Sequence, residues 1–181
     1  MMASELRLVE PVTERIYFAI GISPVGHVLT AQSTNGICAV YLGKSPALMI
    51  ATLQQQFPRA KCINDGYAIK NTLSEVIELI HHPQEYREFT LDLRGTDFQK
   101  YVWQALREIP VGTTVSYSDI ADNLHNTGAV RAVASACAAN NIAVIIPCHR
   151  VIRKDGSLAG YRWGLESKQA LLRREGVTLT Q

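Results

Sequence analysis

Little in this sequence would place the protein in a membrane or in an oxidising compartment. It has only four cysteines, and they form neither a Cys-x-x-Cys pair nor the dense pattern of a disulfide-stabilised fold. A zinc site is therefore not expected, and a reducing, intracellular setting is favoured. No apolar run approaches the roughly 18 residues of a membrane-spanning helix. The N-terminus lacks the charged-then-apolar pattern of a signal peptide, so we expect neither a membrane span nor secretion.

Repeats, low-complexity segments and a strong imbalance of charge are absent as well. The 181 residues have a formal net charge of +2, with 47% hydrophobic and 19% charged side chains, which is typical of one large or two small globular domains. Residues 1–95 carry 8 basic and 9 acidic side chains, whereas residues 96–181 carry 10 and 7. This mild positive bias in the second half is compatible with nucleic-acid binding but does not require it.

The most informative segment that is present is Ile-Pro-Cys-His-Arg-Val, residues 146–151. An apolar run over residues 142–146 precedes it and predicts a buried strand. Pro147 has no N–H group and cannot continue a paired strand. Cys148 is therefore expected where the buried strand ends and the chain turns, with its thiol facing a cleft.

Two neighbours of Cys148 are candidates for activating its thiol. Thiolate is the nucleophilic form of cysteine, and the imidazole of His149 and the guanidinium of Arg150 both favour it. Adjacent side chains of a strand point to opposite faces, so contact between Cys148 and His149 requires a turn or an intervening water. The alternative interpretation is a buried, inert cysteine that ends a core strand, with His149 and Arg150 on the surface.

The first half of the chain predicts a sheet followed by helices. Its β-rich runs are separated by Ser-Pro and Thr-Asn-Gly turns, as in an antiparallel meander. Ser45 and Pro46 have the cap and first-turn preferences of a helix that runs to about Phe57. The pair His81-His82 is interpreted as the end of a second helix rather than as a metal site. We expect strands over residues 16–22, 25–32, 36–42 and 89–93, and the second helix over residues 68–81.

The second half predicts a helical unit. Capping boxes at Thr96-x-x-Gln99 and Ser116-x-x-Asp119 open two helices. A third is expected over residues 129–140, and the short turn before it is typical of a helix-turn-helix. We then expect a hairpin of residues 151–154 and 157–161 closed by Asp155-Gly156, followed by an amphipathic helix over residues 165–175 that ends at Gly176.

The third of these helices has an unusually smooth surface. Between Ala129 and Ala136, Arg131 is its one long polar side chain. A major-groove reader normally uses several such side chains, whereas a smooth helix can approach DNA closely from the minor groove without sequence preference. The alternative is a core helix that packs through its alanines and merely exposes Arg131. Glu175 opposes the dipole of the last helix, so it is either a solvated acid or has a partner such as His149.

Together these motifs resemble the methylated-DNA–protein-cysteine methyltransferases, which repair 6-O-methylguanine. The resemblance covers essentially the whole chain and is greatest to the C-terminal domain of the bacterial adaptive-response protein Ada. Human-type members bind a structural zinc ion and Ada has an additional zinc domain, and neither set of cysteines occurs here. Both a fragment and a stand-alone homologue therefore remain open. The motifs that carry the resemblance are Pro-Cys-His-Arg-Val at 147–151, Ser-Tyr at 116–117, Arg131, Asn140 and Leu-Leu-x-x-Glu-Gly at 171–176.

The resemblance implies an α/β fold of two domains. Residues 1–94 would form a ribonuclease-H-like domain, and residues 95–181 a winged helix-turn-helix domain that binds double-stranded DNA through the minor groove. It also implies a monomer without cofactor or metal, in the bacterial cytoplasm and on the nucleoid when bound to DNA. The implied activity is an irreversible, single-turnover transfer of a methyl group from 6-O-methylguanine, and from 4-O-methylthymine, to the protein.

The resemblance further implies roles for individual residues. Cys148 accepts the alkyl group, His149 acts through a water as the base, and Glu175 stabilises the resulting imidazolium. Asn140 fixes the turn and belongs to the same network. The replacement of small residues by Arg162-Trp163 should narrow the pocket for bulky alkyl groups. DNA and the damaged base would be contacted by Tyr117, which assists extrusion of the nucleotide, by Arg131, which fills the gap in the base stack, by Ala129 and Ala132, by the carbonyls of Cys148 and Val151, and by Lys168.

Two other functions fit part of the pattern. A DNA-binding module without chemistry would match the helix-turn-helix, but non-catalytic relatives replace the reactive cysteine, and Cys148 is present. A cysteine hydrolase would use Cys148, His149 and an acid. It would also need an oxyanion hole, for which no separate motif is evident.

Overall fold

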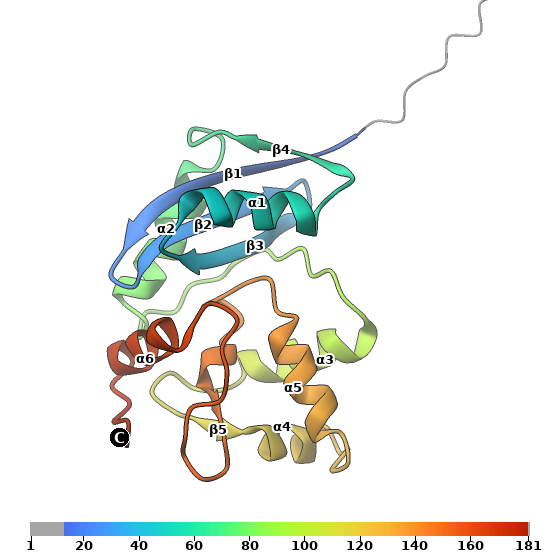
Figure 1. Ribbon diagram of the computed structural model, residues 1–181, viewed down its shortest axis with the longest axis vertical. Helices are drawn as coiled ribbons and strands as arrows, with labels where there is room; N and C mark the ends of the chain where they lie inside the picture. The colour runs from blue at the N-terminus through green and yellow to red at the C-terminus, as the bar shows by residue number, and fades with distance from the viewer. Residues whose placement is uncertain (1–12, 181) are drawn as a thin grey trace, which may run out of the picture.

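The computed structural model describes residues 13–180. A sheet flanked by helices forms one part of the molecule, and a group of short helices forms the other (Figure 1). This is the α/β architecture expected from the sequence. The expectation about a signal peptide concerns the first residues, which lie outside the described range. Within that range, no helix combines the length and the apolar character needed to cross a membrane.

The sheet has four strands in the order β3-β2-β1-β4. The first three form the antiparallel meander that the β-rich runs predict, and β4 pairs in parallel with β1. The parallel fourth strand was not predicted, because its short sequence has no clear alternation of apolar and polar residues. The strands are β1 (Glu14–Ser23), β2 (Gly26–Ser33), β3 (Gly36–Gly43) and β4 (Ala60–Asn64).

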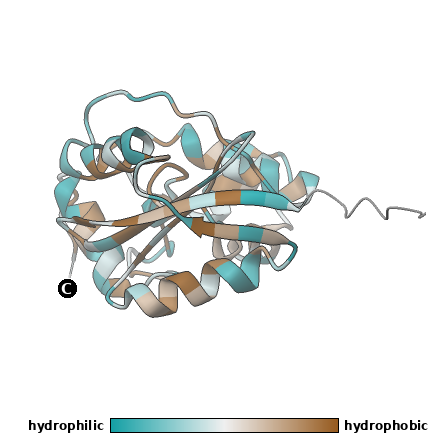
Figure 2. Ribbon diagram, turned by 90° about the horizontal axis from the view of Figure 1, so that it is seen from above, coloured by the Kyte–Doolittle hydropathy of each residue, from teal (hydrophilic) through white to brown (hydrophobic). Residues whose placement is uncertain are grey.

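Two helices cover opposite faces of this sheet (Figure 1). The first, α1 (Pro46–Gln56), begins as predicted: the Ser45 hydroxyl accepts a hydrogen bond from the N–H of Leu48, and Pro46 stands in its first turn. The second, α2 (Lys70–His81), ends at the predicted histidine. Hydrophobic residues occupy the middle of the strands, with hydrophilic residues nearer their ends (Figure 2).

The helical part is built around α3 (Asp97–Arg107), α4 (Tyr117–Asn123) and α5 (Val130–Ala138). Both predicted capping boxes are present, at Thr96 with Gln99 and at Ser116 with Asp119. Because each box satisfies backbone N–H groups that the first turn leaves free, it fixes where its helix begins. The remaining elements are β5 (Val115–Ser116), the 3-10 helix η1 (Cys148–Arg150), β6 (Val151–Ile152) and α6 (Leu165–Arg174).

Two predicted strands are wrong, and for the same reason. The alternating segment 89–93 and the apolar segment 142–146 each touch the free edge of β3 at a single bridge, through Leu91 and Ile142. After Ile142 the chain turns back on itself, with Val144 in the left-handed region at a φ of 69°. Residues 142–146 are buried because the core surrounds them, whereas residues 89–93 are partly buried or exposed. Neither an apolar run nor an alternating pattern shows by itself that a segment pairs along its length with a neighbouring strand.

The predicted hairpin over residues 151–161 is also wrong. β6 pairs in parallel with β5 rather than with the following segment. The Asp155-Gly156 turn does form, closed by a 3.0 Å hydrogen bond from the N–H of Arg153 to the carbonyl of Ser157. Beyond that turn the chain makes no strand before α6, and residues 159–162 line a pocket instead.

One hydrophobic core joins the two parts of the molecule. It includes Val28 and Val40 of the sheet, Val76 of α2, and Val102 and Leu106 of α3. A smaller core lies on the other face of the sheet, under α1. The division into domains at residue 94 and the ribonuclease-H-like description of the first of them stay predictions.

Candidate active site around a buried cysteine

Cys148 lies at the start of η1, in a turn that Asn140 holds in place. The Asn140 side chain is fully buried; its Nδ2 donates to the carbonyl of Ile146 (3.0 Å) and to Sγ of Cys148 (3.3 Å), and its Oδ1 accepts from the N–H of Ile142 (2.8 Å). One amide thus bonds both ends of the apolar turn and the thiol. The expected turn at Cys148 is therefore present, although the strand before it is not.

His149 and Glu175 form a buried pair. The imidazole Nε2 lies 2.8 Å from Oε1 of Glu175, and both side chains are almost fully buried. Glu175 therefore has the partner that was one of its two sequence interpretations. Burial opposes its ionisation, but hydrogen bonds from His149 and Arg150 outweigh that effect and lower the pKa of Glu175 to about 2.

Arg150 pairs with Glu175 rather than stabilising the thiolate of Cys148, which is the role expected from the sequence. Its guanidinium donates to both carboxylate oxygens of Glu175 (2.8–3.2 Å) and to the carbonyl of Ile109 (2.7 Å). The 3-10 turn rotates Arg150 away from Cys148, which a reading of neighbours in sequence cannot reveal. Arg150 therefore compensates the buried carboxylate.

The protonation states follow from these contacts. An ionised Glu175 only accepts, so Nε2 of His149 carries the proton and Nδ1 keeps its lone pair. Nδ1 has no hydrogen-bond partner among residues 13–180. Burial lowers the pKa of His149, against the opposing effect of Glu175. Burial likewise raises the pKa of Cys148, and the Asn140 hydrogen bond offsets only part of this. The resting pair is a thiol and a neutral imidazole.

Lys168 lies in the same buried region. It is fully buried, and its Nζ donates to the carbonyl of Val151 at 2.7 Å. Burial lowers its pKa. Val151 is itself fully buried and does not line the pocket beside the thiol, so the contact of its carbonyl with a bound base stays a prediction.

A pocket of about 530 Å³ opens onto the thiol. Tyr117 lines it from the start of α4, and burial raises the pKa of this phenol to about 12, so it is a hydrogen-bond donor at neutral pH. Cys137 and Tyr161 also line the pocket and were missed as site residues. Their positions depend on how α5 and the loop before α6 pack, and no local motif marks them. The full lining comprises Tyr117, Ala134, Cys137, Ala138, Cys148, Arg153, Ala159, Gly160, Tyr161 and Arg162.

The two residues expected to narrow this pocket lie in different places. Arg162 lines it, whereas Trp163 lines a neighbouring groove beside α1. The rings of Trp163 and Tyr161 form a T-shaped contact, with ring centroids 5.3 Å apart.

α5 presents one packed face and one exposed face. Val133, Ala136 and Cys137 are buried, which agrees with the alternative of a helix packed through small residues. Arg131 and Ala132 are exposed, so the smooth face is also available to a partner. Ala129 is the largely buried N-cap residue of this helix, and its expected contact with DNA stays a prediction.

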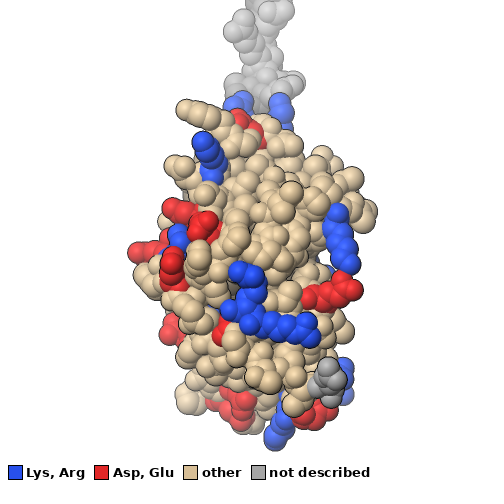
Figure 3. Space-filling model, turned by 90° about the vertical axis from the view of Figure 1, so that its left-hand side faces the viewer, with Lys and Arg blue, Asp and Glu red and all other residues tan. Residues whose placement is uncertain are grey.

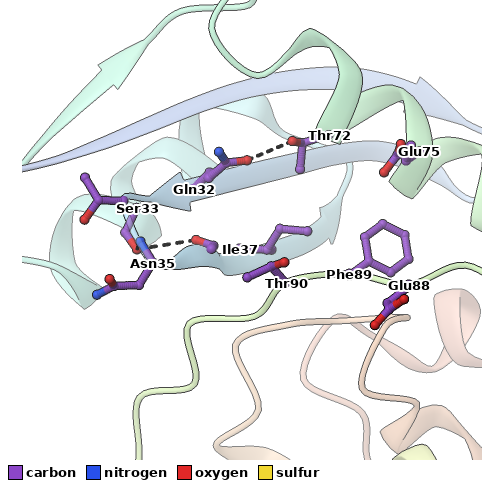
Figure 4. A pocket seen from close by; sticks show the side chains of 11 residues that line it. Gln32, Ser33, Asn35, Ile37, Thr72, Glu75, Glu88, Phe89 and Thr90 are labelled. Carbon is purple, nitrogen blue, oxygen red and sulfur yellow. Dashed lines mark hydrogen bonds between the residues drawn. The ribbon is translucent and has the colours of Figure 1, made fainter.

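One face of the molecule and a second pocket can be set beside this site, and neither offers a comparable nucleophile in the described residues. The face on the left in Figure 1 mixes basic and acidic side chains rather than forming a field of one sign (Figure 3). A polar pocket of about 360 Å³ lies between the β2–β3 turn, α2 and residues 88–90 (Figure 4). Gln32 and Thr72 are hydrogen-bonded across it at 2.8 Å, and no Cys or His lines it. In residues 13–180, no group of three or more His, Cys, Asp or Glu side chains is placed to hold a metal ion.

Comparison with known proteins connects this geometry to one family. The model of the 6-O-methylguanine DNA methyltransferase, DNA binding domain, matches residues 97–177. A methylated-DNA–protein-cysteine methyltransferase of Methanosarcina acetivorans is 39% identical over 163 residues, which cover 89% of this chain and 99% of that protein. The crystal structure of Mycobacterium tuberculosis OGT in complex with DNA has a TM-score of 0.74 and 35% identity, covering 88% of this chain and 92% of that one.

A longer relative matches only in part. The bifunctional transcriptional activator and DNA repair enzyme Ada of Escherichia coli is 49% identical over 160 residues, which cover 88% of this chain. Those residues are 45% of Ada, so the chain spans less than half the length of that relative.

Proposed function

The chain belongs to the methylated-DNA–protein-cysteine methyltransferase family, and from that premise we propose that it repairs DNA by moving a methyl group from 6-O-methylguanine to Cys148. One observation supports this more than any other. The thiol opens onto a pocket while Asn140 bonds its sulfur and a neutral His149 with a free lone pair lies next to it in the chain. This is a nucleophile beside a base whose tautomer a carboxylate fixes.

In the proposed reaction, Nδ1 of His149 removes the thiol proton through a bridging water, and Glu175 stabilises the imidazolium. The thiolate attacks the methyl carbon in line with the carbon–oxygen bond. A carbon–sulfur bond forms as the carbon–oxygen bond breaks, and the electron pair leaves with guanine as a delocalised anion. Tyr117 donates a hydrogen bond to a ring nitrogen of that anion, which is favourable because the donor is in place before charge develops.

The substrate is double-stranded DNA approached from the minor groove. The methyl carbon is enclosed in the duplex, so the nucleotide must rotate out of the stack to reach the pocket. Tyr117 assists this rotation, and Arg131 on the exposed face of α5 fills the space left behind. Since the same attack is open to 4-O-methylthymine, that base is a second substrate. The protein acts as a monomer in the cytoplasm, on the nucleoid when bound to DNA.

The product is a thioether, and nothing in the proposed site removes a methyl group from sulfur. Each molecule therefore reacts once. A time course with excess methylated duplex should show loss of one methyl group per protein molecule and no turnover afterwards. Cys148→Ala should transfer nothing yet retain DNA binding, because recognition rests on α5 and the pocket. Continued turnover by the wild type, or transfer by the variant, would refute the proposal.

A further inference from the structure

Arg162 occupies the place where three parts of the molecule meet. It lines the thiol pocket on one side and the groove beside α1 on the other. It belongs to the irregular segment between β6 and α6, which makes no strand and has few backbone bonds of its own. No step of the proposed reaction uses this side chain.

The contacts of Arg162 connect that segment to the rest of the protein. Its Nη1 donates to the backbone carbonyl of Asn140 at 3.0 Å and to the side-chain oxygen of Asn141. Its guanidinium also lies over two aromatic rings, 5.6 Å from the centroid of Tyr41 and 5.4 Å from that of Trp163. A planar guanidinium can make both kinds of contact at once, whereas an ammonium cannot reproduce that geometry.

The residue that Arg162 binds is the one that bonds the thiol. Asn140 gives its carbonyl to Arg162 and its Nδ2 to Sγ of Cys148. We propose that Arg162 is a positioning residue for the methyl transfer. It binds the segment between β6 and α6 to the backbone at Asn140, and so keeps the Asn140 amide in contact with the sulfur of Cys148. The role rests on the proposed function. Arg162 also connects Tyr41 of β3 to Asn140, the residue whose side chain bonds the thiol.

The charge of Arg162 acts in the same direction as its hydrogen bonds. Burial raises the pKa of Cys148, while the Asn140 hydrogen bond, Lys168 and Arg162 oppose that rise. Among residues 13–180, no carboxylate lines the pocket. Besides His149, the ionisable groups around the sulfur are Tyr117, Cys137, Arg153, Tyr161, Arg162 and Lys168.

Arg153 provides a matched control. Like Arg162, it lines the pocket and is exposed, but unlike Arg162 it makes no side-chain hydrogen bond within the described part of the chain. Arg162→Gln and Arg153→Gln each remove one positive charge from the pocket lining, and only the first breaks the link to Asn140. Arg162→Lys keeps the charge without the planar contacts.

The test measures two quantities on each variant. The first is single-turnover transfer from free 6-O-methylguanine, which involves no DNA phosphate. The second is the pH midpoint of Cys148 carboxamidomethylation by iodoacetamide, followed by mass spectrometry. For Arg162→Gln we expect the saturating rate to fall roughly tenfold, equivalent to one hydrogen bond to a charged group, and the midpoint to rise. The half-saturating concentration should change less than about twofold. Arg162→Lys restores the charge without the planar contacts, so it should recover part of the midpoint shift and part of the rate.

The control separates the outcomes. Arg153→Gln removes a pocket charge but leaves the contacts of Asn140 intact, so it should lose clearly less rate than Arg162→Gln and should not raise the iodoacetamide midpoint. Wild-type behaviour of Arg162→Gln, an equal loss in Arg153→Gln, or an effect confined to the half-saturating concentration would each overturn the positioning role. If the wild type transfers no methyl group, the proposed function fails. The comparison of iodoacetamide midpoints would then still decide whether Arg162 acts on the thiol.

Discussion

Glu175 determines the charge state of the polar residues buried next to Cys148. It accepts hydrogen bonds from both His149 and Arg150, and these keep it ionised despite burial. The carboxylate in turn fixes the His149 tautomer that leaves Nδ1 free to take a proton. In this account the thiolate is formed when the substrate is bound rather than in the resting protein.

The pKa shifts of these two residues predict a loss of stability in acid. The pKa of Glu175 is 4.5 in the unfolded chain and about 2 in the fold, so its contribution is complete above pH 4.5 and is lost as the pH falls towards 2. That contribution is about 3 kcal/mol. The pKa of His149 is lowered from 6.5, so folding keeps it neutral, and stability also declines as the pH falls below 6.5.

Glu175→Gln tests this assignment. The variant should lose about 3 kcal/mol of unfolding free energy at neutral pH, because Arg150 keeps its charge without a counter-ion. It should also lose the pH dependence between 4.5 and 2. Urea unfolding of both proteins across this pH range is the measurement. Parallel pH profiles for the two proteins would contradict the central role of Glu175.

For individual residues, the sequence predicted which side chains belong to the site better than it predicted their contacts. Cys148, His149 and Glu175 were all identified as candidates, and the structure brings the last two together. Arg150 was paired with the wrong group, because its direction depends on a 3-10 turn that no local pattern announces. Cys137 and Tyr161 enter the pocket only through tertiary packing.

Among the secondary structure elements, α5 has the most specific expected role. Its exposed face is made of small side chains with Arg131 among them. Arg131→Ala should slow transfer from a methylated duplex by part of the few kcal/mol that unstacking costs, roughly tenfold or more, and should leave transfer from free 6-O-methylguanine unchanged. Single-turnover rates at fixed salt and saturating duplex provide the comparison.

A control distinguishes this role from a general contact. A surface arginine that only meets a phosphate would weaken duplex affinity slightly and leave the saturating rate unchanged. Equal losses of rate on duplex and free base would instead indicate a disturbed fold.

The helices were more predictable than the irregular segments. Capping boxes and the Ser45-Pro46 start are local signals, and the helices begin where they indicate. The apolar segment before Pro147 was misread, because its backbone bonds go to Val40 of β3 and to the Asn140 side chain. Hydrogen bonds to such partners do not produce a repeating pattern of apolar and polar residues, so they could not be predicted from the sequence.

In the whole molecule, one core passes from the sheet into the helical part. Arg174 of α6 adds a hydrogen bond from Nε to the carbonyl of Ile80 in α2, at 2.9 Å. We therefore predict that both parts unfold together, in a single transition seen alike by far-ultraviolet circular dichroism and by tryptophan fluorescence. Both tryptophans, Trp103 and Trp163, follow residue 94, so fluorescence reports on the second part of the chain. Circular dichroism is needed because it also follows the strands of the first part. Two separated transitions would show that the parts fold independently.

The central claim is that Cys148 alone receives the methyl group, and mass spectrometry tests it most directly. Cys137 lines the same pocket and provides an internal comparison. Burial raises the pKa of Cys137 to about 12, and neither Asn140 nor His149 bonds its sulfur in the described residues. After incubation with methylated duplex, the account predicts one added methyl group per molecule, located by peptide mapping on Cys148. A methyl group on Cys137, or an unmodified protein alongside repaired DNA, would contradict it.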